Sequence, residues 1–280
     1  MKEKNVFSLH FSRFSVTLQA VMSTIIYPSP VFGPVRSRRL GISLGINLLP
    51  EGGKWCSFDC IYCECGFNAD HRTHNPLPSP EQVEAVLTAK LEEMKAEGLT
   101  PDVLTFAGNG EPTLHPQFPE IVHSVLKVRD INCPSAKLSI LSNGTQIHRP
   151  EIRQALLLFD NNIQKLDTVS QEYIERVDRP QGAYDVEKKI QELKEFHGHV
   201  IIQTMFMKGE FEGRSVSNID EEAFVTPYLS AIKKIQPQSV MVYTIDRETP
   251  AHGLQKAAPE ELDAIADKIR ALGIPCSVSY

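Results

Sequence analysis

The sequence lacks a long apolar stretch, since nowhere do eighteen apolar residues follow one another. A helix that crosses a bilayer needs about 20 such residues, so a membrane span is excluded and no membrane partner is expected. The sequence also lacks an excess of basic residues, because its formal net charge is -6. Domains that bind nucleic acid carry a positive surface. An RNA substrate would therefore need a local basic patch.

The chain also lacks a secretory signal and a disulfide framework. Its first 21 residues contain neither a small-residue cleavage site nor a long apolar core. Of its six cysteines, four lie between Cys56 and Cys65, while Cys133 and Cys276 stand alone. Such clustering is typical of a metal site and not of paired disulfides. We therefore expect a protein of the reducing cytoplasm.

The domain organisation is expected to be simple. The segment that begins at Met22 looks like a natural start, which leaves the residues before it as an added stretch. Chain termini are often poorly ordered. Neither a fixed repeat nor a low-complexity segment divides the chain. We expect an N-terminal extension over residues 1–29 and one catalytic domain over residues 30–280.

From Gly41 onward, short apolar runs alternate with amphipathic stretches, which is the rhythm of βα units. The expected strands are 41–49, 102–108, 137–143, 163–170, 199–207 and 239–245, with a short terminal strand over 274–280. The expected helices are 81–97, 118–128, 151–158, 184–196, 221–235 and 259–272. Several strands are too uniformly apolar for a half-solvated sheet and fit parallel strands covered by helices. Six such units form an open barrel or a doubly wound sheet, and periodicity alone does not distinguish the two.

Three cysteines follow the first expected strand with the spacing CxxxCxxC, namely Cys56, Cys60 and Cys63. Soft thiolate ligands select iron-sulfur clusters or zinc over hard cations. Three thiolates on one loop can hold three corners of a [4Fe-4S] cubane, which leaves the fourth iron open to a small molecule. The alternative is a zinc ion held by the same cysteines and by His71 or His74.

The loop resembles that of the radical S-adenosylmethionine (radical SAM) superfamily, whose motif normally has an aromatic residue before its third cysteine. Tyr62 holds that place before Cys63. The resemblance implies a (β/α)6 partial TIM-like barrel of parallel strands, with the site at the carboxyl ends of the strands. It also implies two cofactors, a [4Fe-4S] cluster on the three cysteines and SAM, whose amino and carboxylate groups bind the open iron. Cys65 is expected to be a structural thiol, because it follows Cys63 too closely to share a cubane face.

In that family, an electron from the cluster cleaves SAM to a 5′-deoxyadenosyl radical, and the aromatic residue lies near the adenine. Hydrogen abstraction from a bound substrate is then expected, although nothing in the sequence identifies the substrate. An electron donor such as flavodoxin or ferredoxin would be a partner. These expectations describe an oxidoreductase-type enzyme whose specific reaction is unknown.

The second expected strand ends in a glycine-rich turn, Gly108-Asn109-Gly110-Glu111-Pro112. Glycines let the backbone approach a ligand closely, and an acid can bind an ammonium group. The turn resembles the GGE motif of the family, which contacts the methionyl amino group of SAM, although Asn109 replaces the middle glycine. A simple turn is the alternative interpretation.

Polar residues also stand at the ends of the later strands, which is the active face of a parallel barrel. By the resemblance, four of these side chains would surround the ribose and methionine moieties of SAM, and one main chain would contact its adenine. The side chains are those of Asn143, Asp167, Ser170 and Gln203, and the main chain is that of Ile245. Asn-Gly turns and helix caps explain some of these residues equally well.

Arginines in three places form candidate sites for an anionic substrate, because guanidinium groups suit phosphate and carboxylate. They are Arg36, Arg38 and Arg39 before the first strand, Arg176 and Arg179 in RVDRP, and Arg247 after the sixth strand. We expect the first group to border the opening near the metal loop and to bind a small anion. Simple solvation is the alternative for each arginine.

Taken with GNGEP, KLD and RVDRP, the arginines before the first strand resemble those of uncharacterised bacterial relatives of the radical SAM tRNA-wyosine synthases. Those synthases carry further cysteines ahead of the motif, whereas no cysteine precedes Cys56 here. Three alternatives to an unassigned radical SAM reaction stay open: modification of an RNA base, activation of a partner protein as a glycyl radical, and a non-enzymatic zinc-binding module.

Overall fold

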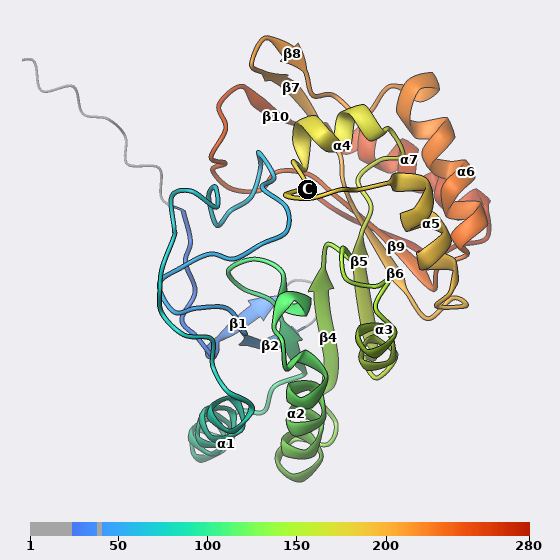
Figure 1. The fold of residues 1–280 in the computed structure, drawn as a ribbon. Coiled ribbons are helices and arrows are strands. Elements are labelled where there is room, and N and C mark those ends of the chain that lie inside the picture. The colour runs from blue at the N-terminus through green and yellow to red at the C-terminus, as the bar shows by residue number, and fades with distance from the viewer. Residues whose placement is uncertain (1–23, 38–40) are drawn as a thin grey trace, which may run out of the picture.

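The computed structural model describes residues 24–37 and 41–280, and its centre is one eight-stranded sheet (Figure 1). The strand order is β1-β2-β3-β4-β5-β6-β9-β11, and every neighbouring pair from β2 onward is parallel. β1 forms an antiparallel hairpin with β2. The sheet is a partial TIM-like barrel, as the sequence predicts. The strands are β1 Val31–Ser37, β2 Gly41–Ile46, β3 Val103–Phe106, β4 Lys137–Ser142, β5 Asn161–Lys165, β6 Ile201–Met205, β9 Ser239–Tyr243 and β11 Cys276–Ser279.

The helices cover the outside of the sheet, with α1, α2 and α3 along one half and α5, α6 and α7 along the other (Figure 1). The apolar faces of helices and sheet form one large core that includes Leu87, Phe106 and Ile202. Ser79 caps α1 through a capping box with Gln82. The helices are α1 Pro80–Ala96, α2 Phe118–Asn132, α3 Pro150–Leu156, α4 Gln171–Val177, α5 Val186–Lys194, α6 Thr226–Ile235 and α7 Pro259–Ala271, with short helical turns η1 Pro112–Leu114 and η2 Glu221–Val225.

The six predicted strands correspond to β2, β3, β4, β5, β6 and β9, and the predicted terminal strand is β11. Several elements were not predicted: β1, helix α4, and a small three-stranded sheet in the order β10-β7-β8. These strands are β7 Met207–Phe211, β8 Arg214–Ser215 and β10 Leu254–Lys256. No helix within residues 24–37 and 41–280 is long and apolar enough to cross a membrane.

The predicted strand over 199–207 is wrong in its extent, because the chain leaves the barrel after Met205 and continues as β7. The side chain of Asn218 explains the break. Its amide donates to the Met205 carbonyl at 2.8 Å, and its oxygen accepts from the Met207 N–H at 2.9 Å. These bonds replace the ladder bonds that a continuing strand would make. The small sheet therefore stands at the carboxyl end of the barrel.

A second, smaller apolar cluster lies at that same end. It joins the loop after β2 to α4, β7 and the segment before β10, and its members include Ile61, Tyr173, Val177, Met207 and Ala251. Because these side chains are buried, the loop after β2 is fixed on a packed surface instead of lying free in solvent. This loop carries the cysteine motif.

Candidate metal centre and active site

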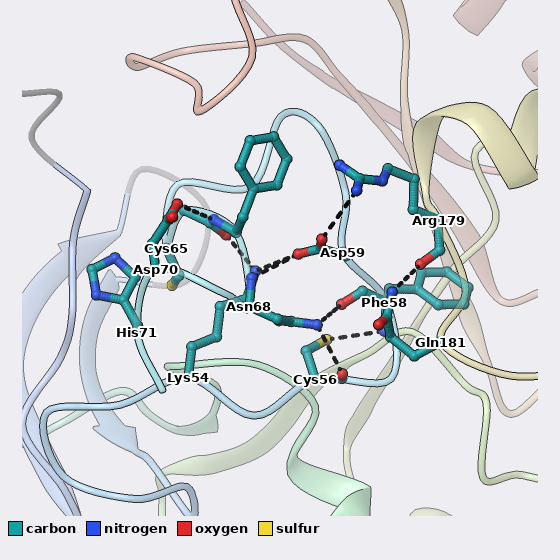
Figure 2. A network of polar contacts seen from close by, with 12 residues as sticks. Lys54, Cys56, Phe58, Asp59, Cys65, Asn68, Asp70, His71, Arg179 and Gln181 are labelled. Atoms are coloured by element: carbon teal, nitrogen blue, oxygen red, sulfur yellow. Dashed lines mark hydrogen bonds and ion pairs between the residues drawn. The ribbon is translucent and has the colours of Figure 1, made fainter. Parts of the chain in front are cut away.

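The cysteine loop, defined here as residues 54–70, follows the carboxyl end of β2, and Figure 2 shows several of its residues. It carries Cys56, Cys60 and Cys63, whose thiols are free and partly buried. Asn68 fixes the shape of the loop from within. Its side-chain amide donates to the carbonyls of Cys56 and Phe58 at 3.2 and 3.0 Å. The three cysteines thus sit on a preformed loop at the face where the sequence predicts the site.

The end of α4 holds the loop from outside. The Asp59 N–H donates to the Asp178 carbonyl at 3.0 Å, and the Ile61 N–H donates to the Val177 carbonyl at 2.9 Å. Arg179, which the sequence offered as an anion site, instead pairs with the Asp59 carboxylate at 3.5 Å (Figure 2). The RVDRP segment therefore supports the cysteine loop.

Burial and one lysine set the proton affinities of the thiols. Burial raises the pKa of Cys56 to about 12 and that of Cys60 well above its usual value. A hydrogen bond from Cys65, helped by the Lys54 ammonium, lowers the pKa of Cys63 to about 6 against the effect of burial. Lys54 is itself buried and donates to the Gly66 carbonyl. Its charge therefore lies beside the thiols that must become thiolates to bind a metal.

The donor set of the loop consists of three thiols, which suits a [4Fe-4S] cluster with one open iron. Within the described residues, no three or more Cys, His, Asp or Glu side chains are arranged to hold one metal ion. His71 bonds to the Thr24 hydroxyl at 2.9 Å, and His74 is exposed. An iron-sulfur cluster needs thiolates that each bind a different iron, so its cysteines do not have to converge on one metal ion. Three thiols on one loop meet that demand.

The glycine-rich turn after β3 packs directly on the start of the cysteine loop. Gly110 has a φ of +132°, and a Cβ there would lie 2.1 Å from the Trp55 carbonyl oxygen. The Trp55 N–H donates to the Asn109 carbonyl at 3.0 Å, and the Glu111 N–H donates to the Trp55 carbonyl at 3.1 Å. Only glycine permits this approach, so the motif joins two loops as well as exposing backbone.

Glu111 is 1% exposed, and its carboxylate is enclosed by four donors. They are the Thr113 N–H and hydroxyl at 3.1 and 2.5 Å, the Ser142 hydroxyl at 2.9 Å and the Asn143 N–H at 2.6 Å. Burial raises its pKa, and these hydrogen bonds oppose that effect. The carboxylate thus fixes the turn after β3 to the end of β4.

Asn109 does not face the cavity but binds the segment ahead of β1. Its side-chain oxygen accepts from the Tyr27 N–H at 2.8 Å, and its amide donates to the Tyr27 carbonyl at 2.8 Å. Asn47 also donates to the Tyr27 carbonyl, at 3.2 Å. We call residues 24–30 the strap. Part of the predicted extension, residues 24–29, therefore contacts the site, whereas residues 1–23 lie outside the described part of the chain.

Three other predicted residues make close structural contacts. The Asn143 amide donates to the Ser57 hydroxyl at 3.0 Å and approaches the Cys56 sulfur at 3.6 Å. Asp167 accepts from the Tyr62 hydroxyl and from Lys165. Ser170 caps α4, its hydroxyl accepting from the Tyr173 N–H at 3.3 Å. Asn143 thus touches the cysteine loop directly, and Asp167 touches it through Tyr62.

A cavity of about 530 Å³ lies beside the loop, inside the barrel. Six of the predicted residues line it: Tyr62, Cys63, Gly108, Gly110, Gln203 and Ile245. The other predicted residues stand around it without forming its wall: Cys56, Cys60, Asn109, Glu111, Asn143, Asp167 and Ser170. Cys65 also lines it, with its thiol 3.5 Å from the Gly108 carbonyl oxygen.

Several lining residues were not predicted. Tyr27 of the strap packs its ring 4.4 Å from that of Phe32, and both reach the cavity. Residues of the strands themselves, such as Thr105 and Leu141, line its inner wall. In the sequence, these residues differ from their neighbours only in that successive side chains of a strand point to opposite faces of the sheet. That alternation does not tell which face lines the barrel interior. For Tyr27 no motif gave a signal.

The expected role of the arginines before β2 is wrong for Arg36, which lies in β1. It pairs with Ile42 at the start of β2, whereas the cysteine loop follows the other end of that strand. The hairpin between β1 and β2 causes this, because it directs the chain to the opposite end of the barrel. Arg38 and Arg39 lie outside the described residues. Arg247 does reach the cavity, where it pairs with Glu64 at 2.9 Å, and Arg176 pairs with Glu172.

The barrel and its cysteine loop define a class of protein. Residues 51–214 match the radical SAM superfamily, which is more than half of the chain, so this protein belongs to that superfamily. The family implies a [4Fe-4S] cluster and SAM as cofactors.

Among curated proteins, the chain is 35% identical over 224 residues to a UPF0026 protein of Helicobacter pylori strain J99, which covers 78% of this chain and 66% of that protein. It is 30% identical over 233 residues to the GTPase Obg of Brachyspira hyodysenteriae, which covers 83% of this chain and 32% of that protein. The chain therefore spans less than two thirds of either relative.

Solved structures share the fold at low identity. A radical SAM methyltransferase from Sphaerobacter thermophilus has a TM-score of 0.62 at 15% identity, over 85% of this chain and 66% of that chain. A structure of TYW1 with a lysine-pyruvate adduct bound has a TM-score of 0.58 at 14% identity, over 82% and 73% of the two chains. These comparisons confirm the fold that the sequence predicts.

Proposed function

We propose that this protein binds a [4Fe-4S] cluster through Cys56, Cys60 and Cys63, cleaves SAM reductively, and abstracts hydrogen from a bound substrate. The observation that carries the proposal is the position of the three thiols, which sit on a packed loop at the mouth of the barrel cavity. When bound, the cluster supplies the electron for SAM cleavage and one open iron for the amino acid part of SAM. The protein supplies position and shielding from water.

The residues that line the cavity are assigned direct roles in SAM binding. These are Tyr62, Gly108, Gly110, Gln203 and Ile245. The remaining predicted residues are assigned indirect roles, because their polar atoms are already engaged with the protein. Glu111 and Asn143 fix the glycine-rich turn and the cysteine loop, Asp167 orients Tyr62, Ser170 caps α4 and Asn109 holds the strap.

The cavity wall favours a substrate whose reacting part is uncharged. Its charged lining residues within the described chain are Glu64, Asp246 and Arg247, and Arg247 pairs with Glu64. The inner wall consists of neutral side chains such as Phe32, Thr105 and Leu141. Burial of an unpaired charge against such a wall is costly. A charged part of the substrate would therefore stay at the rim.

No lysine lines this cavity in the described part of the chain. A solved TYW1 carries a lysine-pyruvate adduct, and the wall of this cavity offers no amine for chemistry of that kind. RNA-base modification is not the preferred reaction, because the net charge of -6 gives no general attraction for RNA. A cytoplasmic location and a small electron-transfer protein as the source of electrons complete the proposal.

The test is anaerobic reconstitution of the full chain with iron and sulfide, followed by incubation with SAM and dithionite. We expect a brown protein with about four irons per chain and formation of 5′-deoxyadenosine. Cys60→Ala serves as the matched control and should yield neither. A colourless protein that binds zinc and forms no 5′-deoxyadenosine would overturn the proposal in favour of a zinc-binding module.

A further inference from the structure

A buried group of charges lies directly behind the cysteine loop, and two of its members, Lys165 and Asp178, were assigned no role by the sequence motifs. The Lys165 ammonium contacts the Asp167 carboxylate and lies 3.0 Å from that of Asp178. The Tyr62 hydroxyl donates to Asp167 and lies 3.4 Å from Asp178. We call Tyr62, Lys165, Asp167 and Asp178 the charge cluster.

The charge cluster joins three elements that the sequence places far apart. Lys165 ends β5 and Asp167 follows it, Asp178 is the C-cap of α4, and Tyr62 belongs to the cysteine loop. Asp167 is further fixed by the Met205 N–H, which donates to it at 3.0 Å. Both carboxylates are almost fully buried, at 3% and 2% exposure. Buried carboxylates this close require a cation, and Lys165 supplies it.

Lys165 does more than neutralise the two acids, because its charge also faces the cysteine motif. Its ammonium lies 4.5 Å from the centre of the Tyr62 ring. Tyr62 stands between Cys60 and Cys63 in the motif, so the ammonium lies beside the part of the loop that carries both thiols. The carboxylates of Asp167 and Asp178 raise the pKa of Lys165 well above its usual value, although burial alone would lower it. The ammonium therefore stays charged.

We infer that Lys165 is a positioning residue with an electrostatic function: through the charge cluster it fixes Tyr62, which stands between Cys60 and Cys63, and it sets the reduction potential of an iron-sulfur cluster bound to these cysteines. The inference rests on the proposed function, since it requires a cluster on the three cysteines. Reduction potentials of such clusters depend on the local charge and on solvent exposure. A cation behind Cys60 stabilises the reduced, more negative state, whereas a carboxylate opposes it. Removal of the cation and removal of a carboxylate should therefore shift the reduction potential of the bound cluster in opposite directions.

The experiment uses reconstituted full-length protein and an anaerobic redox titration followed by electron paramagnetic resonance. Lys165→Met removes the cation and keeps the length of the side chain, so the midpoint potential should become more negative. Asp178→Asn removes one carboxylate and should make it more positive. The double variant restores the charge balance and should return close to the wild-type value. Lys208→Met serves as the control, because Lys208 pairs with Glu261 on other elements, and it should cause no shift.

The outcomes separate this inference from the proposed function. If the wild-type protein takes up no cluster, or Cys60→Ala keeps it, the proposed function fails. If Cys60→Ala loses the cluster while Lys165→Met and Asp178→Asn titrate at the wild-type potential, only the role of Lys165 is overturned. A purely structural role would lower the iron content of both variants without moving the two potentials in opposite directions. Should Lys165→Met not fold, Lys165→Gln takes its place, and the same negative shift is expected.

Discussion

At the scale of single residues, the site is built from buried polar groups that are almost all paired within the protein. Glu111 accepts four hydrogen bonds, and the Tyr62 hydroxyl lies between two carboxylates. Buried groups of this kind are costly when unpaired, so each one fixes its neighbours firmly. The cysteine loop thus gains a defined shape before any cofactor binds.

The first prediction concerns the cysteines. Replacement of Cys56, Cys60 or Cys63 by Ala should remove the brown chromophore and SAM cleavage, because each thiolate holds one iron and Cys65, the other thiol of the loop, follows Cys63 too closely to take its place. Iron content and visible absorbance measure this. Cys133→Ala, in the helical core, should keep both. If Cys133→Ala lost the cluster as completely as Cys60→Ala, the three-cysteine assignment would be wrong.

The second prediction concerns Glu111→Gln, which places an amide where one carboxylate now accepts from four donors. The cluster should stay, while the affinity for SAM falls about tenfold to a hundredfold, since charge-assisted bonds contribute about 1.5–3 kcal/mol. Because the carboxylate acts through the Asn143 amide and the turn, the variant should also unfold at lower urea concentration. Calorimetric SAM titration and urea denaturation measure the two effects, with Glu120→Gln at an exposed position as the control. Wild-type SAM affinity would show that the motif is only a turn.

The site residues differ in how readily the sequence predicts them. Two local patterns predicted parts of the site. The spacing of the cysteines predicted the cysteine loop, and the position of GNGEP after a strand predicted the glycine-rich turn. Lys165 stands two residues before Asp167, so strand alternation places both on one side, yet only the fold shows that Asp178 and Tyr62 meet them there. Contacts across such distances in sequence depend on the packing of α4, which no local pattern encodes.

At the scale of elements, parallel strands were predicted well and the segments that join the barrel to other structure were not. The apolar run that forms β3 is wholly buried, and such a run is typical of a parallel strand covered by helices. The break between β6 and β7 depends on Asn218, which lies 13 residues beyond Met205 and satisfies its carbonyl. α4 is one of the shortest helices, with 7 residues, and its amphipathic pattern is correspondingly weak.

The strap carries the third prediction. Asn109→Ala removes two bonds of 2.8 Å to the Tyr27 backbone, each contributing about 1 kcal/mol. Amide exchange of the strap should then become about tenfold faster or more, while the barrel strands keep their protection. Hydrogen-deuterium exchange with mass spectrometry measures this. Asn75→Ala removes one bond to the Glu51 carbonyl on the surface and is the control. Exchange at the wild-type rate in Asn109→Ala would mean that other contacts hold the strap.

At the scale of the whole molecule, one buried lysine links stability to pH. The Lys189 ammonium is buried on α5 without a hydrogen-bond partner, and burial lowers its pKa to about 7 despite the nearby carboxylates of Glu111 and Glu192. Between pH 7 and the usual value of 10.5, the unfolded chain therefore carries one more proton than the folded chain. The contribution of this group to stability rises with pH through that interval.

The fourth prediction follows from this sign. The free energy of unfolding is measured by urea denaturation at pH 7 and at pH 9. From pH 7 to pH 9 it should rise by about 2 kcal/mol more in the wild-type protein than in Lys189→Met. Lys189→Met should also be the more stable protein at pH 7, because it no longer buries a titrating amine. Lys188→Met, on the exposed side of the same helix, should match the wild type. Equal pH dependence in Lys189→Met and the wild type would show that the amine is already satisfied in the folded protein.

The two ends of the sheet have a mechanical consequence. β1 and β11 are the terminal strands of the described sheet, and Val35 and Tyr280 at these edges line the cavity while 44% and 46% exposed. A closed barrel has a fixed girth, because every strand is bonded on both sides. In the described part of the chain this sheet is open between β1 and β11, and β1 is bonded to β2 alone. β1 therefore has fewer ladder bonds to restrain it than the strands from β2 to β9, and we expect the width of the cavity to vary most at this edge.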